Sequence, residues 1–129
     1  MIGIDTNVLL RFYERDNPPQ YESAGRAIRD HAAVFVNELV LLEFVWVCQS
    51  TYRLDRAEIH RRLKAVVDAA EFEFARRESI ERAIDVYGAR KSDFADCLIG
   101  EINRHHGCET TLTFDESAAK AGGRFSVLR

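Results

Sequence analysis

The sequence contains no closely spaced pair of cysteines, no recognisable signal peptide and no long hydrophobic run. Its three cysteines, Cys48, Cys97 and Cys108, are far apart and form no CxxC pair, so neither a disulfide framework nor a cysteine-ligated zinc site is indicated. Met1 leads straight into a short apolar segment, without the basic start and apolar core of a signal peptide. The most apolar stretch, residues 39–48, is about half as long as a membrane span. These absences predict a cytoplasmic protein with no membrane segment.

The sequence contains little proline and has no excess of positive charge. Only Pro18 and Pro19 occur, so no proline-rich linker divides the chain. The 129 residues, of which 47% are hydrophobic and 30% charged, match one globular domain, and we expect a single domain over residues 1–129. The net charge of −3 is not that of a typical nucleic-acid-binding protein, but acids that bind a cation would offset it.

Short extended runs alternate with helical patterns of apolar residues along the chain. The expected strands are residues 2–4, 33–36, 72–75, 110–114 and 125–128. The expected helices are residues 6–15, 18 to about 32, one capped by Asn37 that ends near 51, one capped by Asp55, one ending at Gly88, one from Ser92 to Gly107, and a short one from Glu116. This alternation predicts a three-layer α/β/α fold around a central, mostly parallel sheet of about five strands.

Several acids occupy positions where such a fold places its functional residues. Asp5 follows the first expected strand and Asp115 follows the fourth, and ligands of open α/β sheets lie beyond the carboxyl ends of the strands. Asp93 and Asp96 are three residues apart, which puts them on one face of a helix. Helix capping, or a favourable helix dipole, is the alternative explanation for each of these acids.

Glu43 is the most unusual acid, because it is the only charged residue within an apolar run, residues 39–48, that we expect to be helical. A position in mid-helix excludes capping. If its carboxylate is buried, it needs a cation, a partner or a raised pKa. The alternative is that Glu43 marks the single exposed face of an otherwise buried helix.

A cluster of carboxylates requires a counter-charge. Two carboxylates about 4 Å apart repel by about 4 kcal/mol at an effective dielectric constant of about 20. Oxygen-only ligands suit Mg²⁺ or Mn²⁺, and a water bound to such an ion can attack a phosphodiester. This chemistry requires no serine, cysteine or histidine nucleophile, and no pattern in the sequence provides one.

Together these acids lie in motifs that resemble those of the PIN domain. The motifs are Asp-Thr-Asn at residues 5–7, Glu43, Asp-Phe-Ala-Asp at residues 93–96, and Thr-Phe-Asp at residues 113–115. Their order and distances are similar to those in VapC-type toxins of prokaryotic toxin–antitoxin pairs, over essentially the whole chain. The resemblance implies a PIN-like fold and a metal-dependent endoribonuclease that leaves 5′-phosphate and 3′-hydroxyl ends.

The resemblance also implies roles for particular residues and partners. It implies Mg²⁺ or Mn²⁺ as cofactor, RNA as substrate, a cognate antitoxin and a homodimer. Thr6, Asn7 and Thr113 are expected to orient carboxylates, waters or metal. Asp93 is expected as an additional metal ligand. The residues expected to be both catalytic and metal-binding are Asp5, Glu43, Asp96 and Asp115.

Basic residues near these acids are candidates for contact with RNA phosphates. They are Arg90 and Lys91, beside the acidic helix, and Arg11 on the first helix. Three other functions remain as alternatives. A housekeeping PIN nuclease of RNA maturation would have the same chemistry, and a non-catalytic RNA-binding PIN domain would have the same fold. A Mg²⁺-binding phosphoacceptor receiver module would require adjacent acids after the first strand, where Asp5 stands alone.

Overall fold

The structure is a computed structural model that describes residues 1–119 and 124–129. The residues group into two compact units by their contacts. Residues 1–54 and 68–75 form the N-terminal unit, and residues 55–67 and 76–129 form the C-terminal unit. Within the described ranges, no helix has the length and apolar character needed to cross a membrane.

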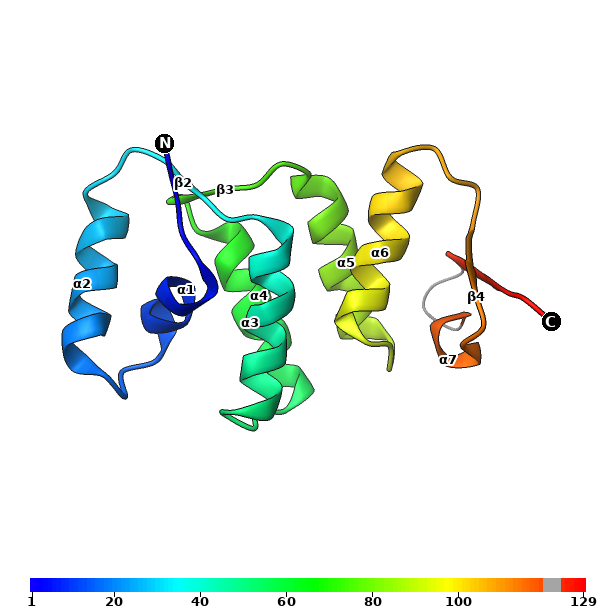
Figure 1. Cartoon of the computed structure of the whole chain (residues 1–129), viewed down its shortest axis with the longest axis horizontal. Coiled ribbons are helices and arrows are strands. Elements are labelled where there is room, and N and C mark those ends of the chain that lie inside the picture. Colours follow the sequence, from blue (N-terminus) through cyan, green and yellow to red (C-terminus); the bar gives the residue numbers. More distant parts are fainter. Residues whose placement is uncertain (120–123) are drawn as a thin grey trace. The chain divides into compact units, whose positions relative to one another are not determined.

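The N-terminal unit contains a three-stranded parallel sheet in the order β1-β2-β3. In the sheet register, Ile2 lies opposite Val34 and Val34 lies opposite Phe72. The chain turns into a helix after each of the first two strands (Figure 1). The elements are β1 (Ile2–Gly3), α1 (Thr6–Tyr13), α2 (Pro18–Arg29), β2 (Val34–Phe35), α3 (Glu38–Ser50) and β3 (Phe72–Glu73).

Local side-chain chemistry sets the helix starts in this unit. Asn37 accepts hydrogen bonds from the backbone N–H groups of Leu39 and Val40 at 2.7 and 3.2 Å, as its predicted capping role requires. Asn17 caps α2, whose first two residues are prolines. Burial of apolar side chains from all three helices then forms the core, which includes Leu9, Ile28, Leu41, Phe44 and Val45.

The C-terminal unit contains four helices and a pair of parallel strands within its described residues. Helices α5 and α6 pack against each other along their lengths. Arg124 donates a hydrogen bond of 3.1 Å to the buried carboxylate of Glu101, which ties the start of the last strand to α6. The elements are α4 (Arg56–Asp68, with Asp68 itself in the N-terminal unit), α5 (Arg77–Ala89), α6 (Phe94–His105), β4 (Thr111–Thr113), α7 (Glu116–Ala119) and β5 (Phe125–Val127).

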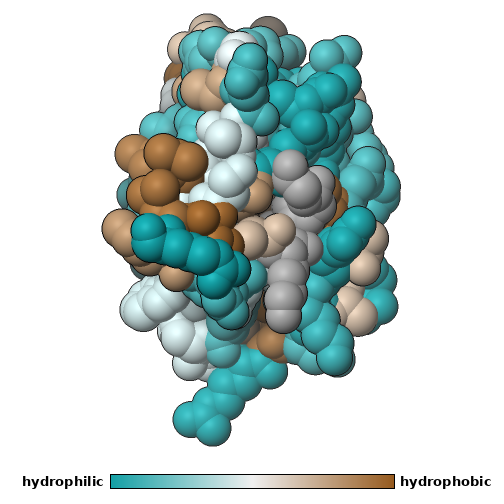
Figure 2. Space-filling view, turned by 90° about the vertical axis from the view of Figure 1, so that its right-hand side faces the viewer, coloured by the Kyte–Doolittle hydropathy of each residue, from teal (hydrophilic) through white to brown (hydrophobic). Residues whose placement is uncertain are grey.

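One face of the β4–β5 pair is apolar and exposed. Leu112, Phe114 and Leu128 are exposed, and alternation along the strands places them on one face. Figure 2 views the side of the molecule on which β4 and the C-terminus lie, and it shows a hydrophobic patch beside hydrophilic side chains. Apolar area of this kind is usual at surfaces that bind another protein.

The predicted α/β class and parallel pairing of strands are confirmed, whereas some element ends differ from the predictions. The helix expected to reach residue 32 ends at Arg29, and the one expected to reach residue 15 ends at Tyr13. The helix expected to start at Ser92 begins at Phe94. The backbone carbonyl of Ser92 instead accepts a hydrogen bond from Arg56, so this residue stays outside the helix.

Gly88 does not end α5, which continues to Ala89. Gly88 instead allows α5 to approach α4 closely within the C-terminal unit. A Cβ atom added at Gly88 would lie 2.4 Å from Nε2 of His60 on α4. Gly107 has the predicted role: it follows α6 with φ of +89°, a left-handed conformation that favours glycine.

Candidate active site

Asp5 occupies the turn between β1 and α1. Its Oδ1 atom accepts a hydrogen bond of 3.0 Å from the backbone N–H of Val8, so the side chain caps the helix. Asp5 is nevertheless exposed, and capping uses one carboxylate oxygen. A ligand role for Asp5 is therefore compatible with capping, because the capping hydrogen bond engages only Oδ1.

Glu43 is exposed on α3, so its carboxylate is not the buried group that the apolar run suggested. The Thr6 hydroxyl donates a hydrogen bond of 2.8 Å to Glu43 Oε1, which links the first acidic motif directly to Glu43. Leu39 and Trp46, on the same stripe of α3, are 68% and 66% exposed. One face of α3 packs in the core, and the apolar side chains of Leu39 and Trp46 next to Glu43 are exposed to solvent. Both faces are therefore apolar.

Three acids of the C-terminal unit interact electrostatically. Asp93 is the N-cap residue of α6 and its side chain makes no capping hydrogen bond, while Asp96 lies in the first turn. Burial raises the pKa of Asp96, and the charges of Asp93 and Asp115 raise it further. The two predicted acidic motifs of this unit are therefore close enough to influence each other.

Asp115 is held in place by the residues around it. Its Oδ1 atom accepts a hydrogen bond of 2.8 Å from the backbone N–H of Ser117, at the start of α7. The Asp115 backbone N–H donates to the Thr113 hydroxyl at 3.0 Å. Thr113 thus stabilises the turn that carries Asp115, a contact that agrees with its expected orienting role.

Arg56 is a contributor that sequence reasoning missed. Its guanidinium donates to the backbone carbonyls of Tyr87, Arg90 and Ser92 at distances of 2.7, 2.6 and 2.5 Å. It also stacks over the Tyr87 ring, 3.8 Å from the ring centre. These contacts hold the α5–α6 connection, which leads directly into Asp93. The sequence offered no signal, because the acceptors are backbone carbonyls more than thirty residues away.

The three predicted RNA contacts have different surroundings. Arg90 and Lys91 are exposed, in the connection that Arg56 holds. Arg11 already forms an ion pair with Asp16 and hydrogen bonds with Gln20 and Tyr52. Contact of Arg11 with phosphate would compete with these partners, so Arg90 and Lys91 are the freer cations.

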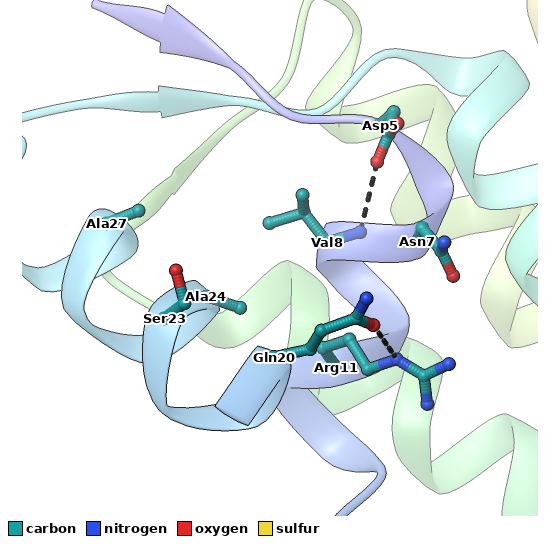
Figure 3. A pocket seen from close by; sticks show the side chains of 8 residues that line it. All are labelled: Asp5, Asn7, Val8, Arg11, Gln20, Ser23, Ala24 and Ala27. Atoms are coloured by element: carbon teal, nitrogen blue, oxygen red, sulfur yellow. Dashed lines mark hydrogen bonds between the residues drawn. The ribbon is translucent and has the colours of Figure 1, made fainter. Parts of the chain in front are cut away.

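A pocket of about 340 Å³ lies between α1 and α2. Figure 3 shows Asp5 at one end of the pocket and the hydrogen-bonded Gln20 and Arg11 at the other. The pocket was not predicted from the sequence. The one feature of the sequence that could have indicated the pocket is a group of small residues on α2 that line it, Ser23, Ala24 and Ala27.

Cys97, directly after Asp96, is not a nucleophile. Burial raises the pKa of its thiol to about 11, so the thiol is protonated at neutral pH. The residues suited to chemistry are therefore oxygen donors, and hard divalent cations prefer such donors. Among the described residues, no three side chains of the histidine, cysteine, aspartate and glutamate types are arranged as a ready metal site. Burial contributes most to the raised pKa of Asp96, and a bound dication would relieve the additional repulsion from Asp93 and Asp115.

Comparison with known proteins identifies the family to which the chain belongs. The model of the PIN domain family matches residues 2–124, a range that includes every acid considered above. A VapC ribonuclease of Aquifex aeolicus (strain VF5) is 25% identical to the chain over an alignment of 122 residues, which covers 92% of this chain and 90% of that protein.

Proposed function

Because this chain belongs to the PIN domain family, we propose that it is a metal-dependent endoribonuclease and the toxin of a toxin–antitoxin pair. The VapC ribonuclease similar to it over most of both chains supports this activity. The observation that carries the proposal is the match of the PIN family model to residues 2–124, a range within which Asp93, Asp96 and Asp115 lie close enough to interact electrostatically. Acids that repel one another at such positions suit a cation site.

The residues proposed to hold Mg²⁺ or Mn²⁺ come from both units. Asp5 and Glu43 belong to the N-terminal unit, and Asp93, Asp96 and Asp115 belong to the C-terminal unit. We propose that the two units are parts of one domain over residues 1–129, in agreement with the span of the family match. When bound, the ion would supply an activated water and stabilise negative charge on the phosphate.

The neighbouring side chains keep these acids ready for that role. The Thr6 hydroxyl holds Glu43 in one orientation, and Thr113 fixes the turn that carries Asp115. Asn7 is exposed one residue beyond Thr6, where its amide can orient water or RNA. Arg90 and Lys91 would contact RNA phosphates next to the acidic helix.

The proposed partners are single-stranded RNA, a cognate antitoxin and a second copy of the chain in the cytoplasm. The exposed apolar stripe of Leu39 and Trp46 beside Glu43 supports a protein partner. A housekeeping nuclease of RNA maturation remains the alternative function. An inhibitory protein encoded beside this chain would distinguish the toxin from that alternative.

Cleavage of RNA by the purified protein tests the proposal. Total cellular RNA is incubated with the protein in Mg²⁺, in Mn²⁺ and in EDTA, and the cut ends are sequenced. We expect discrete cuts with 5′-phosphate ends that require metal and disappear in Asp96→Ala. Asp85→Ala is the matched control, since Asp85 is an exposed acid on the neighbouring α5. Equal cleavage by wild type and Asp96→Ala, or cleavage in EDTA, would refute the proposal.

A further inference from the structure

The pocket between α1 and α2 has a built polar end and an apolar wall. Gln20 Oε1 accepts a hydrogen bond of 2.9 Å from Arg11 Nε, and Arg11 is itself held by Asp16 and Tyr52. This contact fixes the amide so that its nitrogen lies on the side toward Val8, as Figure 3 shows. The pocket thus presents an oriented N–H donor group.

The space in the pocket results from small side chains on α2. Ser23, Ala24 and Ala27 face α1 across the pocket, and Ala24 is almost fully buried. Val8 of α1 provides an apolar surface on the opposite side (Figure 3). A flat group with apolar faces and a polar edge would fit between them. The volume of about 340 Å³ lies within the range of small-molecule sites.

We propose that this pocket binds a nucleobase of the RNA substrate, with the Gln20 amide reading the edge of the base. The identification as an RNA subsite rests on the proposed function, because it takes Asp5 as part of the catalytic centre. Asp5 lines the same pocket, so a bound base would belong to a nucleotide next to the cleaved phosphate. Bases of single-stranded RNA are accessible for such edge contacts, and amide side chains suit them.

The experiment measures base binding separately from cleavage. The four ribonucleoside 5′-monophosphates are titrated into isotope-labelled protein, with Mg²⁺ and with EDTA, while NMR follows the backbone amides of residues 5–11 and 20–27. Ribose 5-phosphate is the control for binding through the phosphate alone. Ser23→Leu fills the pocket, and Glu22→Leu is its control, since Glu22 is also exposed on α2 but does not line this pocket.

We expect at least one nucleotide to shift these amides saturably in the wild type and in Glu22→Leu, and to bind about tenfold more weakly or worse to Ser23→Leu. Ribose 5-phosphate should leave the amides unchanged. Equal shifts with ribose 5-phosphate, or nucleotide binding unaffected by Ser23→Leu, would overturn the inference. It would also be overturned if no nucleotide bound while Ser23→Leu abolished binding of the antitoxin, because the pocket would then receive a protein.

The two proposals fail in different ways. If the nucleotides bind as expected but the protein cleaves no RNA with any metal, the proposed nuclease function is refuted and the base pocket is retained. If the protein cleaves RNA and Ser23→Leu changes neither nucleotide binding nor the bases at the cut sites, the base pocket is refuted and the nuclease is retained.

Discussion

The hydroxyl of Thr6 is the group that orients Glu43, through a hydrogen bond of 2.8 Å. Thr6→Val keeps the side-chain shape and removes the donor, so we expect cleavage to fall about 10- to 100-fold, as for other residues that orient metal ligands. Thr6→Ser keeps the donor and should retain most of the activity. Initial rates at saturating RNA, with a metal titration, provide the measurement. Equal rates for the Val and Ser variants would contradict this role.

The raised pKa of Asp96 predicts how metal-free stability depends on pH. Because the pKa lies above its ordinary value of 3.8, the folded protein binds this proton more tightly than the unfolded chain. The Asp96 contribution to stability therefore decreases as pH rises from about 3.8 through the raised value. In EDTA at neutral pH, Asp96→Asn should melt at a higher temperature than wild type.

The same variant should show a weaker decline of stability across that pH range. Thermal melts between pH 4 and pH 7 in EDTA would measure both effects. Asp85→Asn is the control, since Asp85 is exposed on α5. A lower melting temperature for Asp96→Asn, with an unchanged pH dependence, would mean that the Asp96 carboxylate stabilises the fold.

Among the elements, the connection between α5 and α6 depends most on one distant side chain. Arg56→Met removes the hydrogen bonds to three carbonyls and the stacking on Tyr87. We expect a loss of about 2 kcal/mol or more in the free energy of unfolding, because the part-buried carbonyls of Tyr87 and Ser92 lose a charged donor. Urea denaturation measures this loss. Arg61→Met is the control on the same helix, since its ion pair with Glu58 is exposed and should contribute less than about 1 kcal/mol.

Helix starts were predictable because their causes are local, whereas contacts between distant residues were not. Asn37 and Asp55 cap their helices as the sequence indicated, through N–H groups two or three residues away. The contact of Gly88 with His60 and the contacts of Arg56 depend on how helices pack, which a pattern of residues does not encode. For Glu43, the sequence allowed either burial or a position on the exposed face of the helix, and the structure shows the exposed position. The apolar pattern did not decide between them, because an almost wholly apolar helix does not by itself indicate which face is exposed.

For the whole molecule, motifs in the sequence predicted the candidate acids, of which Asp5 and Glu43 belong to one unit and Asp93, Asp96 and Asp115 to the other. The motifs identified Asp5, Glu43, Asp96 and Asp115 because each follows a strand or lies on a helix at a family-like distance. The pocket between α1 and α2 was not predictable, since it arises from the facing of two helices and a network around Arg11. The candidate acids could thus be named from the sequence, whereas the pocket beside Asp5 could not.

If Asp5 and Asp96 are ligands of the proposed ion, metal binding should stabilise the folded protein. An ion that binds only the folded protein stabilises it by about 2.7 kcal/mol at one hundred times its dissociation constant. We expect Mg²⁺ or Mn²⁺ to raise the melting temperature of wild type, and EDTA to reverse the rise. If both acids bind the same ion, Asp5→Asn and Asp96→Asn should each abolish most of the gain, and the double variant should lose no more. Losses that add would instead show independent sites, since additivity is the behaviour of residues that share no partner.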